Sequence, residues 1–315
     1  MIPGKAAVLV TGSTGFVGAA VAGAILYNTG HQVYGLKRKT SDTKRIRQFC
    51  GGIKLIDADL ADARAVSSII RRIRPVAVIH TAAYGGFSEQ SSVSAAVEVN
   101  STGTFNLLDS ALSAGVKLFI NTGSSSEYGI KNTAMRESDV CQPLSIYGAT
   151  KLAATAMTGA FAGNRMDTVT LRLFSPYGPG DDGRRLIPQL VISAIDGVRL
   201  ELSDPGIVRD YVYISDVAGA YIRALKGSRF GGAVINIGAG RQTTIGRTAA
   251  IIERCSGRKG RFLWNSRKRS ALEPAVWKAD ISTAADKLGW RPVVTLERGL
   301  ALTAGWIRNN RPFYA

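Results

Sequence analysis

The chain has very few residues of the kinds that build metal centres and disulfide frameworks. Among its 315 residues there are three cysteines, far apart at positions 50, 141 and 255, and two histidines, His31 and His80. An odd number of widely spaced cysteines favours reduced thiols over a disulfide framework or a zinc site. We therefore expect no metal site and a cytoplasmic location.

Long hydrophobic runs are missing as well. No apolar segment reaches the roughly 20 residues that a membrane-spanning helix needs. The chain leads from Met1 almost directly into a strand-like segment, so we expect neither a signal peptide nor a membrane partner. A composition of 45% hydrophobic and 20% charged residues is that of a globular protein with one large or two closely packed domains.

Acidic residues are scarce relative to basic ones, with 23 Asp and Glu against 40 Lys and Arg, which gives a net charge of +17. Binding to nucleic acid is one interpretation of this excess. No basic motif with interleaved aromatic residues accompanies the charge, however, and we do not expect nucleic acid as a partner. Solvated helix faces, or a positive field that attracts a small molecule bearing phosphate, explain the excess better.

Glycine is abundant, and three glycines near the N-terminus form a recognisable pattern. An apolar run at residues 6–10 is followed by Thr11-Gly12-Ser13-Thr14-Gly15-Phe16-Val17-Gly18 and then by an apolar helical pattern. This is the order of strand, glycine turn and helix that a dinucleotide-binding unit requires. Gly12 permits the tight turn, Gly15 lets the backbone approach a pyrophosphate, and Gly18 allows close packing of helix on strand.

Strand and helix patterns alternate through the first half of the chain. Further strands are expected at residues 32–37, 53–57, 76–80, 117–122 and 168–174, with helices between them, notably at residues 92–114 and 146–164. This alternation predicts an α/β fold with a Rossmann doubly wound parallel sheet. In such sheets ligands bind beyond the carboxyl ends of the strands. The residues that we expect around a cofactor there are Gly12, Thr14, Gly15, Phe16, Val17, Gly18, Lys37, Arg38, Asp59, Leu60, Ala82, Ala83, Tyr84, Thr122 and Phe174.

Tyr147 and Lys151 stand four residues apart in a predicted helix. Positions i and i+4 share a helix face, so the phenol and the ammonium can approach each other. A neighbouring positive charge lowers the pKa of a phenol from its usual value of about 10 toward neutrality. The alternative is an ordinary amphipathic helix with the tyrosine inside and the lysine outside.

Several motifs recur together over nearly the whole chain. They are Thr11-Gly12-x-x-Gly15-Phe16-x-Gly18, Asp59-Leu60, His80-Thr81-Ala82-Ala83, Asn100-x-x-Gly103-Thr104-x-Asn106-Leu107, Ser124, Tyr147-x-x-x-Lys151, Arg209-Asp210-Tyr211-Val212-Tyr213 and Leu288-Gly289-Trp290-x-Pro292. With them the chain resembles the extended short-chain dehydrogenase/reductase family, the group of nucleotide-sugar epimerases and dehydratases.

The resemblance implies two domains and a homodimer. A Rossmann domain would take residues 1–175 and about 214–240, and a smaller C-terminal α/β domain, residues 176–213 and 241–315, would bind a nucleotide-diphosphate sugar. The resemblance also implies a catalytic group of three residues, Ser124, Tyr147 and Lys151. Tyr147 would exchange a proton with the reacting oxygen, and Lys151 would lower its pKa and hold the nicotinamide ribose. Ser124 would orient the substrate oxygen.

On the substrate side the resemblance implies contacts from Ser124, Ser125, Ser126, Tyr147, Ser175, Arg184 and Arg209. Arg209 resembles the arginine that grips the diphosphate, for which a guanidinium is well suited. An ion pair of Arg209 with Asp210 is the alternative. Many relatives carry asparagine at the position of Ser175, so the contact there is open.

The end of the second strand bears on the choice of cofactor. An acid there accepts bonds from the 2′-hydroxyl of NAD, whereas a basic residue favours the 2′-phosphate of NADP. This chain has Lys37 and Arg38 at that place, so we expect NADP(H) to be preferred, with NAD(H) possible. The alternative is that both are solvated turn residues. By resemblance, Asp59 contacts the adenine.

The family performs more than one reaction. Dehydratases carry an acid shortly after the catalytic hydroxyl residue, often as Asp-Glu, whereas here Ser125 and Ser126 take the two places that follow Ser124, which disfavours dehydration. The basic strand end favours one-way reduction of a nucleotide-linked 4-keto-6-deoxy sugar. A nucleotide-sugar 4-epimerase with retained NAD is the alternative. A non-catalytic dinucleotide-binding sensor is a third possibility, against which the complete catalytic group argues.

Overall fold

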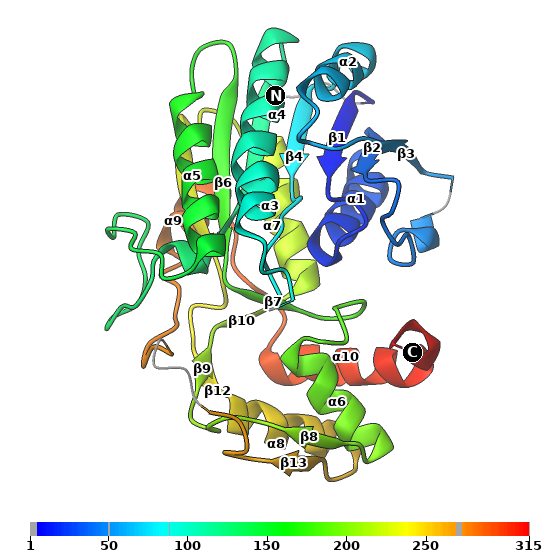
Figure 1. Cartoon of the computed structure of the whole chain (residues 1–315), viewed down its shortest axis with the longest axis vertical. Coiled ribbons are helices and arrows are strands. Elements are labelled where there is room, and N and C mark those ends of the chain that lie inside the picture. The colour runs from blue at the N-terminus through cyan, green and yellow to red at the C-terminus, as the bar shows by residue number, and fades with distance from the viewer. Residues whose placement is uncertain (1–4, 50, 88, 269–272, 315) are drawn as a thin grey trace.

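The computed structural model describes residues 5–49, 51–87, 89–268 and 273–314. Their elements form two units, one above the other in Figure 1. The upper unit is built around one large sheet, and the lower unit consists of helices and short strand pairs.

The upper unit contains a sheet of seven strands in which all neighbours pair in parallel. In spatial order they are β11 (Ala233–Ile237), β6 (Asp167–Leu173), β5 (Leu118–Ser124), β4 (Ala77–His80), β1 (Ala7–Thr11), β2 (Gln32–Lys37) and β3 (Ile53–Asp57). The prediction of a Rossmann doubly wound sheet is confirmed.

Helices cover both faces of this sheet, which explains why its strands read as continuous apolar runs rather than as alternating patterns. In β1, Val8 and Val10 belong to one hydrophobic cluster together with residues of α1 (Phe16–Thr29) and α7 (Ile214–Lys226). Leu9, between them, belongs to a second cluster with α2 (Ala63–Ile73) and α4 (Gly103–Ser113). Successive side chains of one strand therefore support opposite helix layers.

The helix expected at residues 92–114 is interrupted. It consists of α3 (Val93–Val97), a π-helical turn η2 (Glu98–Thr102) and α4. Such wide turns are frequent at functional sites, and this one contains the buried Asn100. The helix expected at residues 146–164 is α5 (Ile146–Ala160).

The lower unit contains three helices and small strand pairs. The helices are α6 (Leu186–Asp196), α8 (Ile245–Ser256) and α10 (Leu296–Asn309). The strand pairs are β7 (Ser175–Tyr177) with β10 (Tyr211–Tyr213), β9 (Val208–Arg209) with β12 (Thr243–Thr244), and β8 (Arg199–Glu201) with β13 (Arg261–Leu263). Short turns of 3-10 helix lie at η1 (Arg47–Phe49), η3 (Ser125–Glu127) and η4 (Arg311–Tyr314). Helix α9 (Ser282–Leu288) packs beside α7 and β11, so it lies with the sheet.

The two units meet through the loop after β2 and the C-terminal end of the chain. Lys44 Nζ donates to the Phe313 carbonyl at 2.9 Å, and Arg45 Nε donates to the Gly180 carbonyl at 2.7 Å. In the part of the chain that the structure describes, no helix has the length and apolar character needed to cross a membrane.

Candidate active site

The glycine turn between β1 and α1 leaves no room for side chains. Gly12 has a φ of 63°, and a Cβ built on it would lie 2.6 Å from the Ala82 nitrogen. A Cβ on Gly18 would lie 2.1 Å from the Gly12 carbonyl oxygen. The turn is closed by a hydrogen bond of 2.9 Å from the Gly15 nitrogen to the same carbonyl. The backbone can thus approach a ligand at the N-terminus of α1, where amide groups favour phosphate.

A cleft of about 230 Å³ opens at the carboxyl ends of β1 to β4. Among the expected cofactor residues, those that line it are Gly12, Thr14, Gly15, Lys37, Arg38, Asp59, Leu60, Ala82, Ala83 and Tyr84. A cradle of glycine backbone at one end and polar strand ends at the other fits a dinucleotide.

The other expected cofactor residues do not line this cleft. Phe16, Val17 and Gly18 lie in the first turn of α1, and Thr122 Oγ1 lies 2.6 Å from the hydroxyl of Tyr221. Phe174 differs from the expectation: it is 3% exposed and its ring packs 6.4 Å from that of Tyr128 in a small core cluster. Phe174 follows β6 directly, and its buried ring is part of the core rather than of the cleft wall.

Ser124, Tyr147 and Lys151 come together between β5 and α5. Ser145 caps α5 by accepting a hydrogen bond of 3.0 Å from the Gly148 nitrogen, which fixes the start of the helix just before Tyr147. Tyr147 is half-buried and is hydrogen-bonded to the Ser124 side chain, and a Cβ on Gly85 would lie 3.5 Å from it. Lys151 is buried one turn further along.

The electrostatics of this group differ from the expectation in one respect. Burial raises the pKa of Tyr147, and the groups that oppose the rise are the Ser124 hydroxyl and the Arg185 guanidinium, not Lys151. Burial lowers the pKa of Lys151 to about 8, while the Glu127 carboxylate acts in the opposite direction. The charge of Lys151 is felt instead at His80. The shared helix face is therefore present, and the effects that act on the phenol come from burial, Ser124, Arg185 and Glu127.

His80 is a structural residue. Its Nε2 lies 3.0 Å from Thr104 Oγ1, whose own hydrogen is donated to the Asn100 carbonyl. Nε2 must therefore donate, and Nδ1 accepts from Thr11 Oγ1 at 2.7 Å. Burial, followed by the charge of Lys151, lowers the pKa of His80 to about 3, so it stays neutral.

Asn100 joins the loop after β4 to α5. Its Oδ1 accepts from the Tyr84 nitrogen at 2.8 Å, and its Nδ2 donates to the Tyr84 carbonyl and to Thr150 Oγ1. Both ends of the amide are thus engaged, and Asn100 fixes the distance between the cleft wall and the Tyr147 helix.

A buried ion pair beneath the Ser124 loop was not expected from the sequence. Glu127 and Arg172 approach to 2.8 Å, with their side chains 0% and 3% exposed. The other carboxylate oxygen of Glu127 accepts from the Ser124 nitrogen at 2.7 Å. Ser126 donates its backbone nitrogen to Ser124 Oγ at 3.2 Å, and Ser125 is buried. Both carboxylate oxygens of Glu127 are therefore engaged, one with Arg172 and the other with the loop at Ser124.

Two arginines of the lower unit enclose an aromatic ring near Tyr147. Arg184 and Arg185 lie 4.1 and 4.5 Å from the ring centre of Phe87, which belongs to the loop after β4. Arg184 is also paired with Asp182 at 2.8 Å. Arg185 was missed as a site residue in the sequence, although it stands next to Arg184 in the same basic pair.

Arg209 has a different partner from the one considered. Its Nη1 lies 2.8 Å from Glu273 Oε2, and its Nη2 donates to Glu273 Oε1 at 2.9 Å. Asp210 is instead fully buried and accepts backbone hydrogen bonds, for example from Ala239 at 2.6 Å. Ser175 lies half-buried at the start of β7, and its nitrogen donates to the Asp210 carbonyl.

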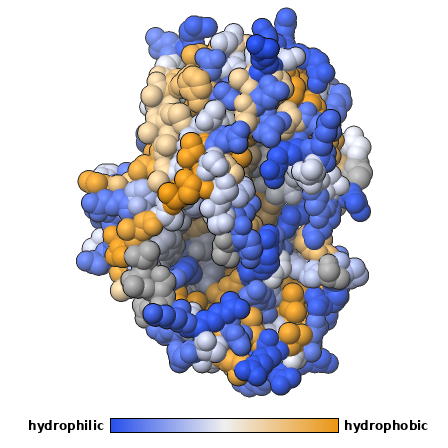
Figure 2. Space-filling model, in the orientation of Figure 1, coloured by the Kyte–Doolittle hydropathy of each residue, from blue (hydrophilic) through white to orange (hydrophobic). Residues whose placement is uncertain are grey.

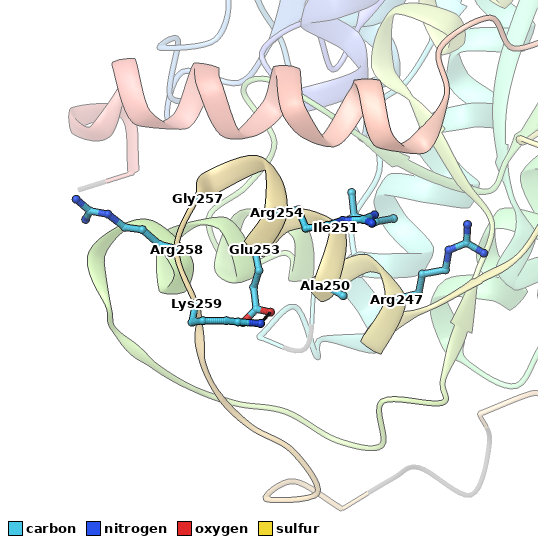
Figure 3. Close-up of a pocket in the computed structure, with 8 residues that line it drawn as sticks. All are labelled: Arg247, Ala250, Ile251, Glu253, Arg254, Gly257, Arg258 and Lys259. Atoms are coloured by element: carbon cyan, nitrogen blue, oxygen red, sulfur yellow. Dashed lines mark hydrogen bonds and ion pairs between the residues drawn. The ribbon is translucent and has the colours of Figure 1, made fainter.

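A larger pocket, of about 560 Å³, lies in the lower unit and shares no residue with the cleft. Figure 3 shows its basic side chains, from α8 and the turn after it, pointing in different directions. Lys259 is paired with Glu253 at 3.2 Å, and Arg258 donates to the Ile195 carbonyl at the end of α6. The Arg258 charge thus lies at the C-terminal end of α6, where a cation is stabilising.

Comparisons with known proteins agree with this arrangement. Residues 8–238 match the model of the NAD dependent epimerase/dehydratase family. The UDP-glucuronate 4-epimerase of Thermodesulfobacterium geofontis (strain OPF15) is 29% identical over 319 residues, which cover 96% of both chains. The UDP-glucose 4-epimerase of Bacillus subtilis (strain 168) is 27% identical and covers 96% of this chain and 97% of its own.

Among solved structures, the chain is similar to the UDP-glucuronic acid 4-epimerase from Bacillus cereus in complex with UDP-glucuronic acid and NAD. The two superpose with a TM-score of 0.87 at 28% identity, covering 96% of this chain and 99% of that one.

Proposed function

Because the chain belongs to the NAD-dependent epimerase/dehydratase family of extended short-chain dehydrogenases/reductases, we propose that it is a nucleotide-sugar 4-epimerase that retains NAD. The observation that carries the proposal is the placement of Ser124, Tyr147 and Lys151 beside a glycine-lined cleft. The similar proteins reported above are named as 4-epimerases, which supports this reaction over the one-way reduction expected from the basic strand end.

The residues divide the work as follows. A bound nicotinamide dinucleotide would supply a hydride acceptor and donor, and epimerisation requires that the hydride come back to the opposite face of the sugar carbon. Tyr147 removes the proton from the sugar hydroxyl as the hydride leaves and restores it when the hydride returns. Ser124 orients that oxygen through the hydroxyl that also contacts Tyr147. Lys151, buried beside them, supplies positive charge to the ribose side of the cofactor.

Dehydration fits the site less well. Elimination of water from a sugar needs an acid or base that reaches the substrate. Glu127, the acid nearest in sequence to Ser124, is fully buried and bonded to Arg172 and to the Ser124 nitrogen. It has no access to a ligand above the loop.

The second candidate is NADPH-dependent reduction of a nucleotide-linked 4-keto-6-deoxy sugar. The observation that favours it is the position of Lys37 and Arg38 on the wall of the cleft, where a 2′-phosphate would lie. The two reactions differ in cofactor balance, because epimerisation consumes no reducing equivalents.

Arg185 favours a sugar that carries a carboxylate. Its guanidinium acts on Tyr147, so it lies close to the reacting end of the substrate, and it can bind a carboxylate with two charge-assisted bonds. We expect Arg185→Gln to reduce kcat/KM for UDP-glucuronate by about tenfold or more and to change that for UDP-glucose much less. An equal loss on both substrates would contradict this assignment.

Product identification decides between the two reactions. The purified protein is incubated with UDP-glucose or UDP-glucuronate, and separately with a nucleotide-linked 4-keto-6-deoxy sugar and NADPH. We expect conversion of one UDP-sugar into its C4 epimer without added cofactor and without net change in nicotinamide absorbance. Stoichiometric loss of NADPH on the keto sugar, with no epimer formed from either UDP-sugar, would replace the epimerase by the reductase.

A further inference from the structure

The strand end that the sequence marks as basic contains an acid contributed by the neighbouring strand. Lys37 and Asp57 are register partners in the parallel pairing of β2 with β3. Lys37 Nζ lies 2.5 Å from Asp57 Oδ1. The Lys37 side chain is 15% exposed and that of Asp57 is 45% exposed, so the ammonium is largely enclosed while the carboxylate still reaches solvent.

This ion pair changes the charge that a ligand meets. Lys37 is part of the cleft wall, and its charge is matched by that of Asp57. A 2′-phosphate approaching Lys37 would be attracted by one charge and repelled by the other at nearly the same distance. A neutral 2′-hydroxyl meets no such repulsion, and an ionised carboxylate accepts hydrogen bonds from hydroxyl groups.

We propose that Asp57 determines the cofactor preference: by pairing with Lys37 it makes this strand end suit the 2′-hydroxyl of NAD rather than the 2′-phosphate of NADP. The acid that NAD-binding sites place at the end of β2 is here replaced by a lysine whose charge is neutralised from β3. The inference rests on the dinucleotide site of the proposed function and adds to it the residue that selects the cofactor.

Arg38 limits the size of the preference. Arg38 is exposed on the wall of the same cleft, and its backbone nitrogen donates to Ser41 Oγ at 3.1 Å. Because its positive charge remains available to a phosphate, NADP(H) is bound more weakly than NAD(H) rather than rejected. We expect a difference of about tenfold, the effect of one hydrogen bond to a charged group.

A charge series at the Lys37–Asp57 ion pair tests the proposal. Asp57→Asn leaves Lys37 unpaired and makes the strand end more positive, whereas Lys37→Met leaves Asp57 unpaired and makes it negative. Asp109→Asn, which removes an exposed carboxylate on α4, is the matched control for the loss of one acid. Dissociation constants for NADH and NADPH are measured by nicotinamide fluorescence on full-length protein cleared of nucleotide with charcoal, at one salt concentration.

The expected ratio of Kd(NADH) to Kd(NADPH) rises in the order Lys37→Met, wild type and Asp57→Asn, with about tenfold between neighbours. Asp109→Asn should match the wild type. A ratio in Asp57→Asn within twofold of the wild type, with thermal unfolding showing a folded protein, would overturn the proposal, as would a lack of effect in Lys37→Met.

The cofactor titration contains no sugar. It therefore tests the role of Asp57 independently of the proposed epimerase reaction. A charge-ordered ratio in a protein that acts on no nucleotide sugar would reject the proposed reaction and leave the role of Asp57 standing. A protein that epimerises a UDP-sugar but shows no dependence of the ratio on Asp57 would do the reverse.

Discussion

At the scale of single residues, Tyr147 is in surroundings that suit a proton carrier but keep it protonated. Burial raises the pKa of its phenol, while contact with Ser124 and the charge of Arg185 oppose the rise. Its reactivity as a base therefore depends on positive charge close to its oxygen. Lys151, with a pKa lowered to about 8 by burial, can change its own charge near neutral pH.

We expect Tyr147→Phe to lower kcat by roughly 10²–10⁴-fold, the usual contribution of a positioned acid or base. The ring stays in place, so packing and dinucleotide binding should be unchanged. Steady-state kinetics and NADH titration measure the two effects. Tyr27→Phe, at a tyrosine that is 70% exposed on α1, is the control and should behave as wild type. A Tyr147→Phe protein with full turnover would remove this residue from the mechanism.

The pKa values of two adjacent aspartates at the junction of the two units are shifted in opposite directions. Burial raises the pKa of Asp181 to about 7, against the Asp182 amide and the charges of Arg185 and Arg45. Hydrogen bonds from Arg184 lower the pKa of Asp182 to about 2. An unfolded aspartate has a pKa of about 3.9. Between about pH 4 and 7 the folded chain thus binds a proton at Asp181 that the unfolded chain lacks, and stability falls as pH rises.

Replacing Asp181 and replacing Asp182 should therefore change the stability of the folded chain with different pH dependences. We expect the stability of Asp181→Asn, relative to wild type, to increase by about 2–3 kcal/mol between pH 5 and pH 8. Asp182 contributes stability that is complete above about pH 4 and is lost only as the pH falls toward 2, so Asp182→Asn should be destabilised equally at both pH values. Urea unfolding at pH 5 and pH 8 measures both. A pH-independent effect of Asp181→Asn would show that this carboxyl is ionised in the folded chain.

At the scale of elements, the junction of β5 and η3 depends on a side-chain pair that lies beneath it. Glu127 pairs with Arg172 of β6 and accepts from the Ser124 nitrogen. The same residue therefore contributes to stability and to the position of Ser124. These two roles can be separated, because only one of them requires the carboxylate next to Ser124.

Glu127→Leu should cost about 3–5 kcal/mol of unfolding free energy, because it leaves the Arg172 charge buried without a partner. Glu127→Leu combined with Arg172→Met should recover much of that loss, since apolar pairs of similar volume replace buried ion pairs at little cost. The double variant should still have a reduced kcat, because the Ser124 nitrogen has lost its acceptor. Urea unfolding and kinetics on both variants test this. A double variant with wild-type kcat would show that the pair has no part in positioning Ser124.

The elements were predictable wherever one strong local pattern decides them. Six of the seven strands of the sheet lie within a residue or two of their expected limits because each is a short apolar run bounded by turn residues. The π-helical turn at η2 was not predictable; it contains Asn100, whose amide bonds to the Tyr84 backbone 16 positions away. Helical periodicity alone carries no sign of such a bond.

The site was predictable in its motifs but not in its pairings. Gly12 lines the cleft and Tyr147 is hydrogen-bonded to Ser124, while the catalytic role of Ser124, Tyr147 and Lys151 stays a prediction. The ion pairs of Lys37 with Asp57 and of Arg209 with Glu273 join residues 20 and 64 positions apart. The first pair follows from the register of two strands, and the second from a later segment that folds back against Arg209. A local sequence pattern encodes neither contact. A basic strand end read alone therefore indicates NADP, whereas its acidic partner lies 20 positions further along the chain.

At the scale of the whole molecule, large hydrophobic side chains gather on one side of the upper unit. In Figure 2 the upper left of the molecule is orange and tan, where Figure 1 places α4 and α5. Val97 of α3, Phe105 of α4 and Ile146 of α5 are 45%, 47% and 47% exposed. Exposed apolar patches of this kind mark interaction surfaces, and a homodimer through these helices remains our prediction.

A charge placed in the middle of this surface tests the homodimer. We expect the wild type to be a dimer by light scattering and Phe105→Glu to weaken it at least about a hundredfold, because an unpaired charge in an interface costs about 3 kcal/mol or more. Val293→Glu, at a valine that is 79% exposed outside these helices, is the matched control and should leave the dimer intact. Because Phe105 does not line the cleft, the monomeric variant should still bind NADH. A wild-type chain that sediments as a monomer at micromolar concentration, or a Phe105→Glu variant that dimerises as tightly as Val293→Glu, would show that this surface is not the interface.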